Sequence, residues 1–91
     1  MAQQVNVRLH TTLQTEPGKG SWTYIVWDGV ADTFGTRRPV KVRGNIDGYE
    51  FENSFLPLKD GTHLLGVNQK VRKVIGKKAG DKVMVEIYGK V

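Results

Sequence analysis

The stretch that decides the fold of this chain is VKVRGNIDGYEFENSF, residues 40–55. Apolar and polar residues alternate on both sides of Asp47-Gly48, a pair typical of a type I′ hairpin turn. Counting outward from this turn gives three cross-strand pairs: Asn45 with Glu50, Gly44 with Phe51, and Arg43 with Glu52. The register places opposite charges face to face, and we expect Gly44 to leave room for the Phe51 ring. The stretch therefore predicts two antiparallel strands.

Four further segments on either side of this hairpin have the composition or the alternation of β-strands. They are residues 5–15, 22–27, 62–67 and 83–87. Residues 22–27 are apolar on both faces, which predicts a central position for that strand. Pro17 and two glycines predict a loop over residues 16–20. Together with the hairpin, these segments predict a mainly β protein.

Two short helices are expected between the strands. Asp28 is predicted to cap a helix that runs through Phe34 and ends at Gly35, and Asn68 to cap a second helix of the same length that ends at Gly76. The two glycines lie 41 positions apart. This spacing predicts an internal pseudo-two-fold repeat, with halves of about residues 22–56 and 62–91.

The composition limits the protein to a few classes. Its 91 residues fit a single domain, residues 1–91, which we expect to form a β-barrel of six to seven strands with two capping helices. There is no cysteine, which excludes disulfides and thiolate chemistry and suits a reducing compartment. No apolar run has the length of a signal sequence or membrane span. A cytoplasmic location is therefore expected.

Positive charge is concentrated in the second half of the chain. The 14 Lys and Arg against 9 Asp and Glu leave a formal charge of +5. Six of these cations, against Asp81 alone, form a basic cluster: Lys70, Arg72, Lys73, Lys77, Lys78 and Lys82. Arg37, Arg38, Lys41 and Arg43 form a second, weaker cluster at the equivalent place in the first half. Such clusters could bind phosphates, or the helical members could simply complement a helix dipole.

Aromatic residues and histidines offer the remaining candidate sites. Trp22, Tyr24 and Trp27 could form a ligand-binding or base-stacking platform, although a small domain has more use for them in its core. Trp27 is on the face opposite the other two and is expected to be the exposed one. His10 and His63 are expected to be solvated, and neither belongs to a catalytic triad or a zinc motif. No catalytic residue, metal or cofactor is therefore expected.

Several motifs resemble a known family. Tyr24-Ile25-Val26, residues 40–48, Val71-Arg72-Lys73 and residues 80–83 are similar to the small bacterial family catalogued as domain of unknown function 1905. The resemblance covers nearly the whole chain and implies a double-split β-barrel capped by short helices. It implies no activity.

The second half also resembles the AbrB-type swapped-hairpin fold of transition regulators, through residues 67–76 and 80–83. That fold builds its barrel from two chains, so the resemblance implies that a chain carrying both halves closes its barrel as a monomer. Asn68 stands where that family usually has Pro, and Leu64 where it usually has a basic residue that contacts DNA. The resemblance therefore transfers the fold better than DNA binding.

Two functions remain open on this basis. The first is a non-enzymatic binding module for an anionic partner, nucleic acid or an acidic protein, which the basic clusters would contact. The alternative is a small apolar ligand-binding or structural barrel, with Trp22, Tyr24 and Trp27 near the ligand. No membrane partner is expected in either case.

Overall fold

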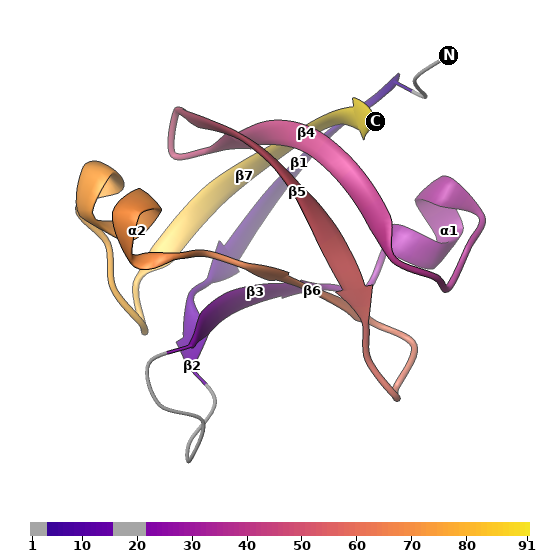
Figure 1. Cartoon of the computed structure of the whole chain (residues 1–91), viewed down its shortest axis with the longest axis horizontal. Coiled ribbons are helices and arrows are strands. Elements are labelled where there is room, and N and C mark those ends of the chain that lie inside the picture. The colour runs from indigo at the N-terminus through magenta and orange to yellow at the C-terminus, as the bar shows by residue number, and fades with distance from the viewer. Residues whose placement is uncertain (1–3, 16–21) are drawn as a thin grey trace.

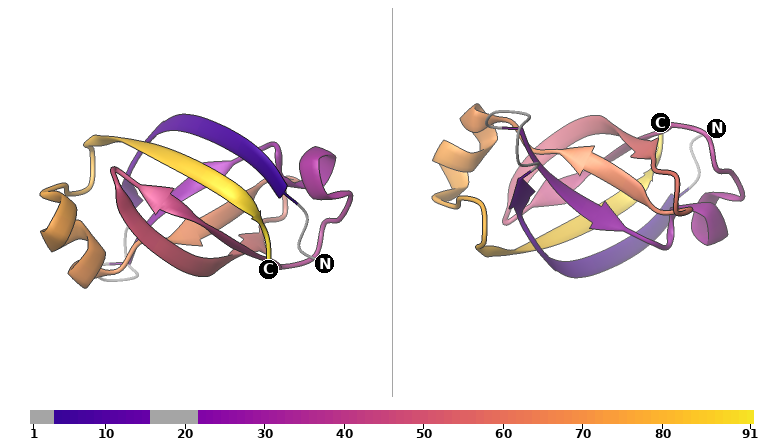
Figure 2. Two further views of the ribbon diagram at one scale, coloured as in Figure 1. Left: turned by 90° about the horizontal axis from the view of Figure 1, so that it is seen from above. Right: turned by 90° about the horizontal axis from the view of Figure 1, so that it is seen from below.

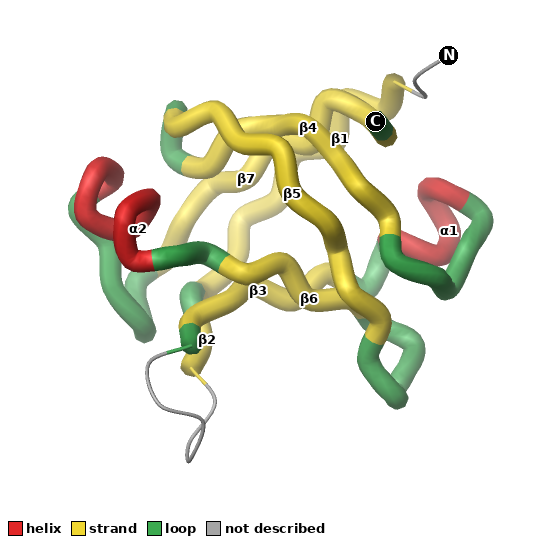
Figure 3. Tube along the Cα trace, in the orientation of Figure 1, coloured by secondary structure: helices red, strands yellow, loops and turns green. Residues whose placement is uncertain are grey.

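The computed structural model describes residues 4–15 and 22–91, with side chains from Asn6 onward. The loop predicted over residues 16–20 lies outside the described residues. Seven strands and two helices follow one another along the chain (Figures 1 and 3). They are β1 (Gln4–Thr12), β2 (Gln14–Thr15), β3 (Thr23–Trp27), α1 (Val30–Phe34), β4 (Val40–Ile46), β5 (Tyr49–Pro57), β6 (His63–Gly66), α2 (Gln69–Ile75) and β7 (Lys82–Lys90).

The strands form one antiparallel sheet in the order β1-β7-β4-β5-β6-β3-β2. The first and last strands of this order are separated in sequence by Leu13 alone. One bent segment therefore pairs with β7 through β1 and with β3 through β2, and the sheet curls around a common interior (Figure 2). This architecture confirms the mainly β, barrel-like fold with two helices.

The hairpin from β4 to β5 has the predicted register. Asn45 faces Glu50, Gly44 faces Phe51, and Arg43 faces Glu52. Both turn residues have positive φ, 48° at Asp47 and 88° at Gly48, as a type I′ turn requires. The structure gives a further reason for Gly44: a Cβ at this position would collide with the backbone carbonyl oxygen of Glu86, so the glycine permits the close approach of β7.

The interior is filled by alternate residues of the strands. Val42, Phe55, Val85 and Ile87 are fully buried, together with Ile25 of β3. The prediction of a central position for β3 was wrong, because β3 is next to the last strand in the sheet order and pairs with β2 over only two residues. Its second apolar face is consequently left on the outside of the sheet.

Both helices end where the sequence predicts, but only α2 begins after its predicted cap. Gly35 and Gly76 close α1 and α2 in the left-handed conformation, with φ of 69° and 70°. Asn68 caps α2 by accepting a hydrogen bond from the Val71 N–H at 3.0 Å. The predicted Asp28 cap of α1 was wrong: Gly29 occupies the N-cap without a side-chain bond. The helices also differ in length, with five residues in α1 and seven in α2.

Strands of the first predicted half pair with strands of the second. β3 pairs with β6, and β4 pairs with β7. The two helices lie at opposite ends of the longest axis of the molecule, α1 at one end and α2 at the other (Figure 1). Neither helix, nor any other in the described part of the chain, is long and apolar enough to cross a membrane. The segment directly after α1 therefore lies at the opposite end of the molecule from α2.

A candidate ligand-binding cleft between β5 and β6

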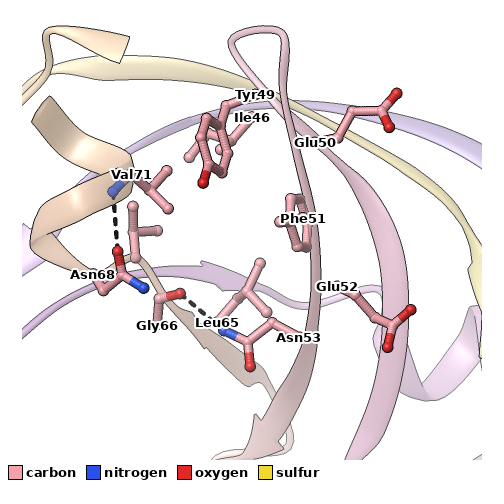
Figure 4. A pocket seen from close by; sticks show the side chains of 11 residues that line it. Ile46, Tyr49, Glu50, Phe51, Glu52, Asn53, Leu65, Gly66, Asn68 and Val71 are labelled. Carbon is pink, nitrogen blue, oxygen red and sulfur yellow. Dashed lines mark hydrogen bonds between the residues drawn. The ribbon is translucent and has the colours of Figure 1, made fainter. Parts of the chain in front are cut away.

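The wall of the sheet opens between β5 and β6. β5 pairs with β4 from Tyr49 to Phe55, but with β6 only through Leu56 and Pro57. Upstream of Leu56 the two strands diverge, and a cleft of about 290 Å³ lies between β5 and the segment that leads from β6 into α2 (Figure 4). The cleft is thus a consequence of β5 changing its partner along its length.

The floor of the cleft is apolar and its rim is polar. The apolar lining comes from four elements and the loop before α2: Ile46, Tyr49, Phe51, Leu65, Val67 and Val71. Tyr49, Phe51 and Asn53 point toward the cleft, whereas the carboxylates of Glu50 and Glu52 point away from it (Figure 4). This division follows from the period-two alternation of side chains along β5.

Asn53 bridges the two sides where the cleft narrows. Its Nδ2 donates to the carbonyl oxygen of Gly66 at 3.3 Å, and its Oδ1 accepts from the Ser54 N–H at 2.8 Å. One side-chain amide therefore pairs with a backbone group on each side of the split. Beyond this bridge, toward Tyr49, no ladder joins β5 to β6 in the described residues.

The backbone of β5 presents to the cleft hydrogen-bonding groups that have no ladder partner among the described residues. A two-residue hairpin turn makes Ile46 and Tyr49 a hydrogen-bonded pair, and the pairs then alternate along the ladder. Tyr49, Phe51 and Asn53 accordingly direct their N–H and C=O groups toward β4. Glu50 and Glu52 direct theirs toward the split between β5 and β6.

Charge on the outer face of β5 is partly paired. The carboxylate of Glu52 lies 3.2 Å from Lys41 Nζ and 3.3 Å from Arg43 Nη2. The hydrogen bond from Lys41, followed by that from Arg43, lowers the pKa of Glu52 below its usual value. Glu50 is exposed and makes no ion pair with any described residue. The open edge therefore carries one unpaired carboxylate on its outer side.

The predicted basic cluster lies around α2, but two of its members have structural contacts. Arg72 Nε donates to the Val67 carbonyl oxygen at 3.1 Å. Lys77 Nζ donates to the Lys82 carbonyl oxygen at 3.0 Å and lies 3.6 Å from Asp47 Oδ2. The other four side chains are exposed and form no ion pair within residues 4–15 and 22–91: Lys70, Lys73, Lys78 and Lys82.

The second basic cluster does not join the first. Arg37 and Arg38 follow α1, at the end of the molecule away from α2 (Figure 1). Both residues are exposed. The two predicted clusters are therefore separate surfaces.

The aromatic residues of β3 and of the position before it are divided between the two faces of the sheet. Trp27 packs on the core, with its ring 5.6 Å from Phe55 and 6.5 Å from Phe34. Trp22 is 47 % exposed and lies 5.6 Å from the Tyr24 ring on the outer face. The prediction that Trp27 would be the exposed residue was wrong, because Trp27 and Ile25 lie on the same face of β3 and this face is turned toward the core. None of the three lines the cleft.

The two histidines have different environments. His10 is exposed on β1, as expected. His63 was expected to be solvated, but it is only 1 % exposed, and its Nε2 lies 3.1 Å from the Arg38 carbonyl oxygen. On β6, where it pairs with Pro57 of β5, His63 turns inward beneath the segment after α1. In the described part of the chain, no three His, Cys, Asp or Glu side chains gather to hold a metal ion.

The residues that line the cleft were not predicted as a site. Tyr49 and Phe51 were assigned only as strand residues of the hairpin. The available signal was Asn53, a polar residue in the same phase of β5 as Tyr49, Phe51 and Phe55. A polar group in an inward-facing phase indicates that the wall is incomplete at that position.

Comparison with known families agrees with this fold. The family model described as "Domain of unknown function (DUF1905)" matches residues 10–87. The chain belongs to the DUF1905 family. The DUF1905 match includes the hairpin, both helices and every residue that lines the cleft. No curated protein matches the chain. The DUF1905 description names no activity, so a function has to be argued from the geometry.

Proposed function

We propose that this domain is a non-catalytic binding module and that the cleft between β5 and β6 holds its ligand. The observation that carries the proposal is the opening in the sheet wall, which gives access to Tyr49 and Phe51 beside an apolar floor. Its volume of about 290 Å³ is close to the lower end of the range for small-molecule pockets. A ligand with one apolar group of moderate size would fit there.

The lining also indicates the chemistry of the ligand. Apolar side chains form the floor, and the polar lining groups are amides, carboxylates and backbone atoms rather than cations. Burial of apolar ligand surface would supply the affinity, at about 25 cal/mol per Å². Asn53 and Asn68 at the rim would orient polar atoms of the ligand. An anionic ligand is disfavoured in this cleft because none of the residues that line it is a cation.

Indole is a suitable probe, since it is apolar, aromatic and carries a single donor. We expect titration with indole to shift the backbone amide resonances of Phe51, Val67 and Val71 in ¹H–¹⁵N spectra. Phe51→Ala should weaken these shifts at least fivefold. Leu56→Ala is the matched control, because Leu56 is an exposed apolar residue on the same strand outside the cleft. If indole shifts only the amide resonances of Trp22 and Tyr24, it binds outside the cleft and the proposal is contradicted.

A second candidate function is contact with an anionic partner, nucleic acid or an acidic protein, through the surface around α2. The observation that favours it is the set of four exposed lysines without ion pairs among the described residues. Neutralising phosphates supplies most non-specific affinity for nucleic acids.

Fluorescence anisotropy tests the second candidate, with short single-stranded DNA, duplex DNA and RNA at low and high salt. A pull-down for acidic proteins complements it. Lys73→Glu with Lys78→Glu should abolish salt-sensitive binding without unfolding, because neither side chain has a structural contact among the described residues. Arg37→Glu with Arg38→Glu, at the other end of the molecule, is the control. Equal loss in both double variants would argue for non-specific attraction to net charge.

We further propose that the domain acts as a monomer in the cytoplasm. Both halves of the curled sheet come from one chain, which supports a monomer. The absence of cysteine supports a reducing compartment. Size-exclusion chromatography with light scattering should give a mass near 10.2 kDa, and a mass near twice that value would contradict the proposed monomer.

A further inference from the structure

We propose that the ligand of the cleft is an extended peptide segment of a partner protein, which adds a strand between β5 and β6. This inference rests on the proposed function of the cleft and specifies the class of its ligand. The partner segment has alternating apolar residues and a basic residue beside Glu50.

The first argument is the unused backbone edge of β5. Glu50 and Glu52 direct their N–H and C=O groups into the split, where β6 supplies no ladder partner. Gly66 faces the split from the other side, through the carbonyl that Asn53 reaches. Unpaired strand edges are the usual template for β-strand addition, because the added strand satisfies the exposed backbone groups.

The second argument is the position of the Asn53 amide. This amide accepts from the Ser54 N–H of β5 and donates to the Gly66 carbonyl of β6. It performs, with one side chain, the pairing that a peptide group of an intervening strand would perform with both neighbours. The Asn53 amide thus occupies the end of the split, and the cleft continues from this position toward Tyr49.

The third argument is the match between the cleft and an alternating segment. A strand opposite Tyr49–Asn53 would extend about 17 Å over about five residues, with every second side chain directed inward. The inward side chains would contact Phe51, Leu65 and Val67, which lie on the floor. The outward ones would lie beside Glu50, whose carboxylate lacks an ion pair among the described residues. Opposite charges on adjacent strands attract, so a basic residue is favoured there.

The test uses a synthetic probe, acetyl-Lys-Val-Lys-Val-Lys-Val-Lys-amide. Two controls carry the same side chains: one is N-methylated at the valines and the other at the lysines. Because alternate N–H groups of a strand point to opposite neighbours, each control blocks pairing along one edge only. We expect the probe to bind with shifts at Phe51 and Val67, and the methylated peptide whose blocked N–H groups face β5 to bind at least tenfold more weakly.

Hydrogen exchange supplies an independent readout of backbone pairing. If the peptide adds a strand, exchange at the amides of Glu50 or Glu52 should slow at least tenfold on binding. Glu50→Pro removes the N–H that points into the cleft, and should weaken binding at least tenfold. Glu50→Ala keeps this N–H and loses only the carboxylate, so binding should weaken no more than about threefold. If Glu50→Pro does not fold, the affinities of the methylated peptides for the unchanged protein decide whether the peptide backbone pairs with β5.

The outcomes separate this inference from the proposed function. If indole binds in the cleft but the methylated peptides bind as tightly as the parent, or exchange at Glu50 and Glu52 is unchanged, strand addition is wrong and the cleft remains a ligand site. If neither indole nor the peptide perturbs the cleft, both proposals fail. If the cleft residues shift with protein concentration in the absence of peptide, the occupant is a second copy of this chain and the inference is overturned.

Discussion

Asn45 donates a hydrogen bond from Nδ2 to Glu86 Oε1 at 3.3 Å, across the β4–β7 pair in which the two residues face each other. They are 41 positions apart in sequence, the same separation as between the helix-ending glycines Gly35 and Gly76. The Asn45 amide also donates to the Tyr88 hydroxyl at 2.8 Å, and its oxygen accepts from the Gly48 N–H at 3.1 Å. One buried side chain therefore connects the hairpin turn to β7 at the junction of the two halves.

Asn45→Ala is expected to lower the free energy of unfolding by about 1–3 kcal/mol, because it leaves several partners unpaired around a buried position. Urea unfolding followed by circular dichroism measures the change. Glu86→Gln is the milder comparison, since it keeps an acceptor oxygen near Nδ2. A loss below about 0.5 kcal/mol in Asn45→Ala would show that the network contributes nothing to stability.

Gly44→Ala should destabilise the domain by at least about 1–3 kcal/mol, since the new methyl group would collide with the Glu86 carbonyl and displace β7. Gly66→Ala is the matched control. A Cβ at Gly66 would lie 3.7 Å from Trp22 Nε1, which is an ordinary contact. Thermal unfolding of the two variants should differ clearly, and equal melting temperatures would contradict the close approach at Gly44.

The two tryptophans should differ in solvent access. In Trp27→Phe, the remaining Trp22 should emit at longer wavelength and be quenched strongly by acrylamide, because nearly half of it is exposed. In Trp22→Phe, the remaining Trp27 should be protected by Phe34 and Phe55. Trp27→Phe should also be the less stable variant. Similar quenching constants for both would contradict the assignment of the two faces of β3.

His63→Ala should lower stability by about 2–4 kcal/mol, since it removes a buried ring and the hydrogen-bond partner of the Arg38 carbonyl. His10→Ala, at an exposed position, should stay within about 0.5 kcal/mol. Because a carbonyl oxygen only accepts, Nε2 of His63 should carry the proton, which long-range ¹H–¹⁵N spectra of the imidazole can identify. The Nδ1–H form would contradict the bond to Arg38.

Acid should weaken the contacts that Glu52 and Asp60 make. Lys41 and Arg43 lower the pKa of Glu52, and the hydrogen bonds from Thr62 lower that of Asp60. A carboxylate with a lowered folded-state pKa contributes stability that is present above its unfolded pKa and is lost as the pH falls through the folded value. The free energy of unfolding should therefore decrease as the pH is lowered below about 4. Glu52→Gln should make this decrease with pH less steep. An unchanged slope would contradict a role for the Lys41–Glu52–Arg43 contacts in acid sensitivity.

Local sequence signals predicted those parts of the fold that depend on nearby residues. Asp47-Gly48 set the hairpin and its register because few residue pairs adopt positive φ readily. Gly35 and Gly76 ended the helices for the same reason. Asn68 capped α2, but Asp28 did not cap α1, since both residue types compete for caps and turns and the choice depends on where the backbone enters the helix.

The cleft was beyond these local signals, because it arises where β5 pairs with β4 but does not yet pair with β6. Alternation showed that Tyr49, Phe51 and Asn53 share a face, but not that β6 diverges from them. The separation of the two basic clusters likewise depends on the placement of α1 and α2 at opposite ends of the molecule.

The sequence by itself determined the mainly β class, the hairpin register, the helix ends and the positive charge near α2, all of which follow from backbone preferences and spacing within a few residues. Only the tertiary structure decided which face of β3 is buried, that His63 lies inside, why Gly44 is a glycine, and that the wall opens beside Phe51. These features depend on which strands become neighbours. The local sequence does not say which strands become neighbours when a strand is apolar on both faces, as β3 is. The same holds for a glycine such as Gly44, whose close neighbour is on a strand distant in the sequence.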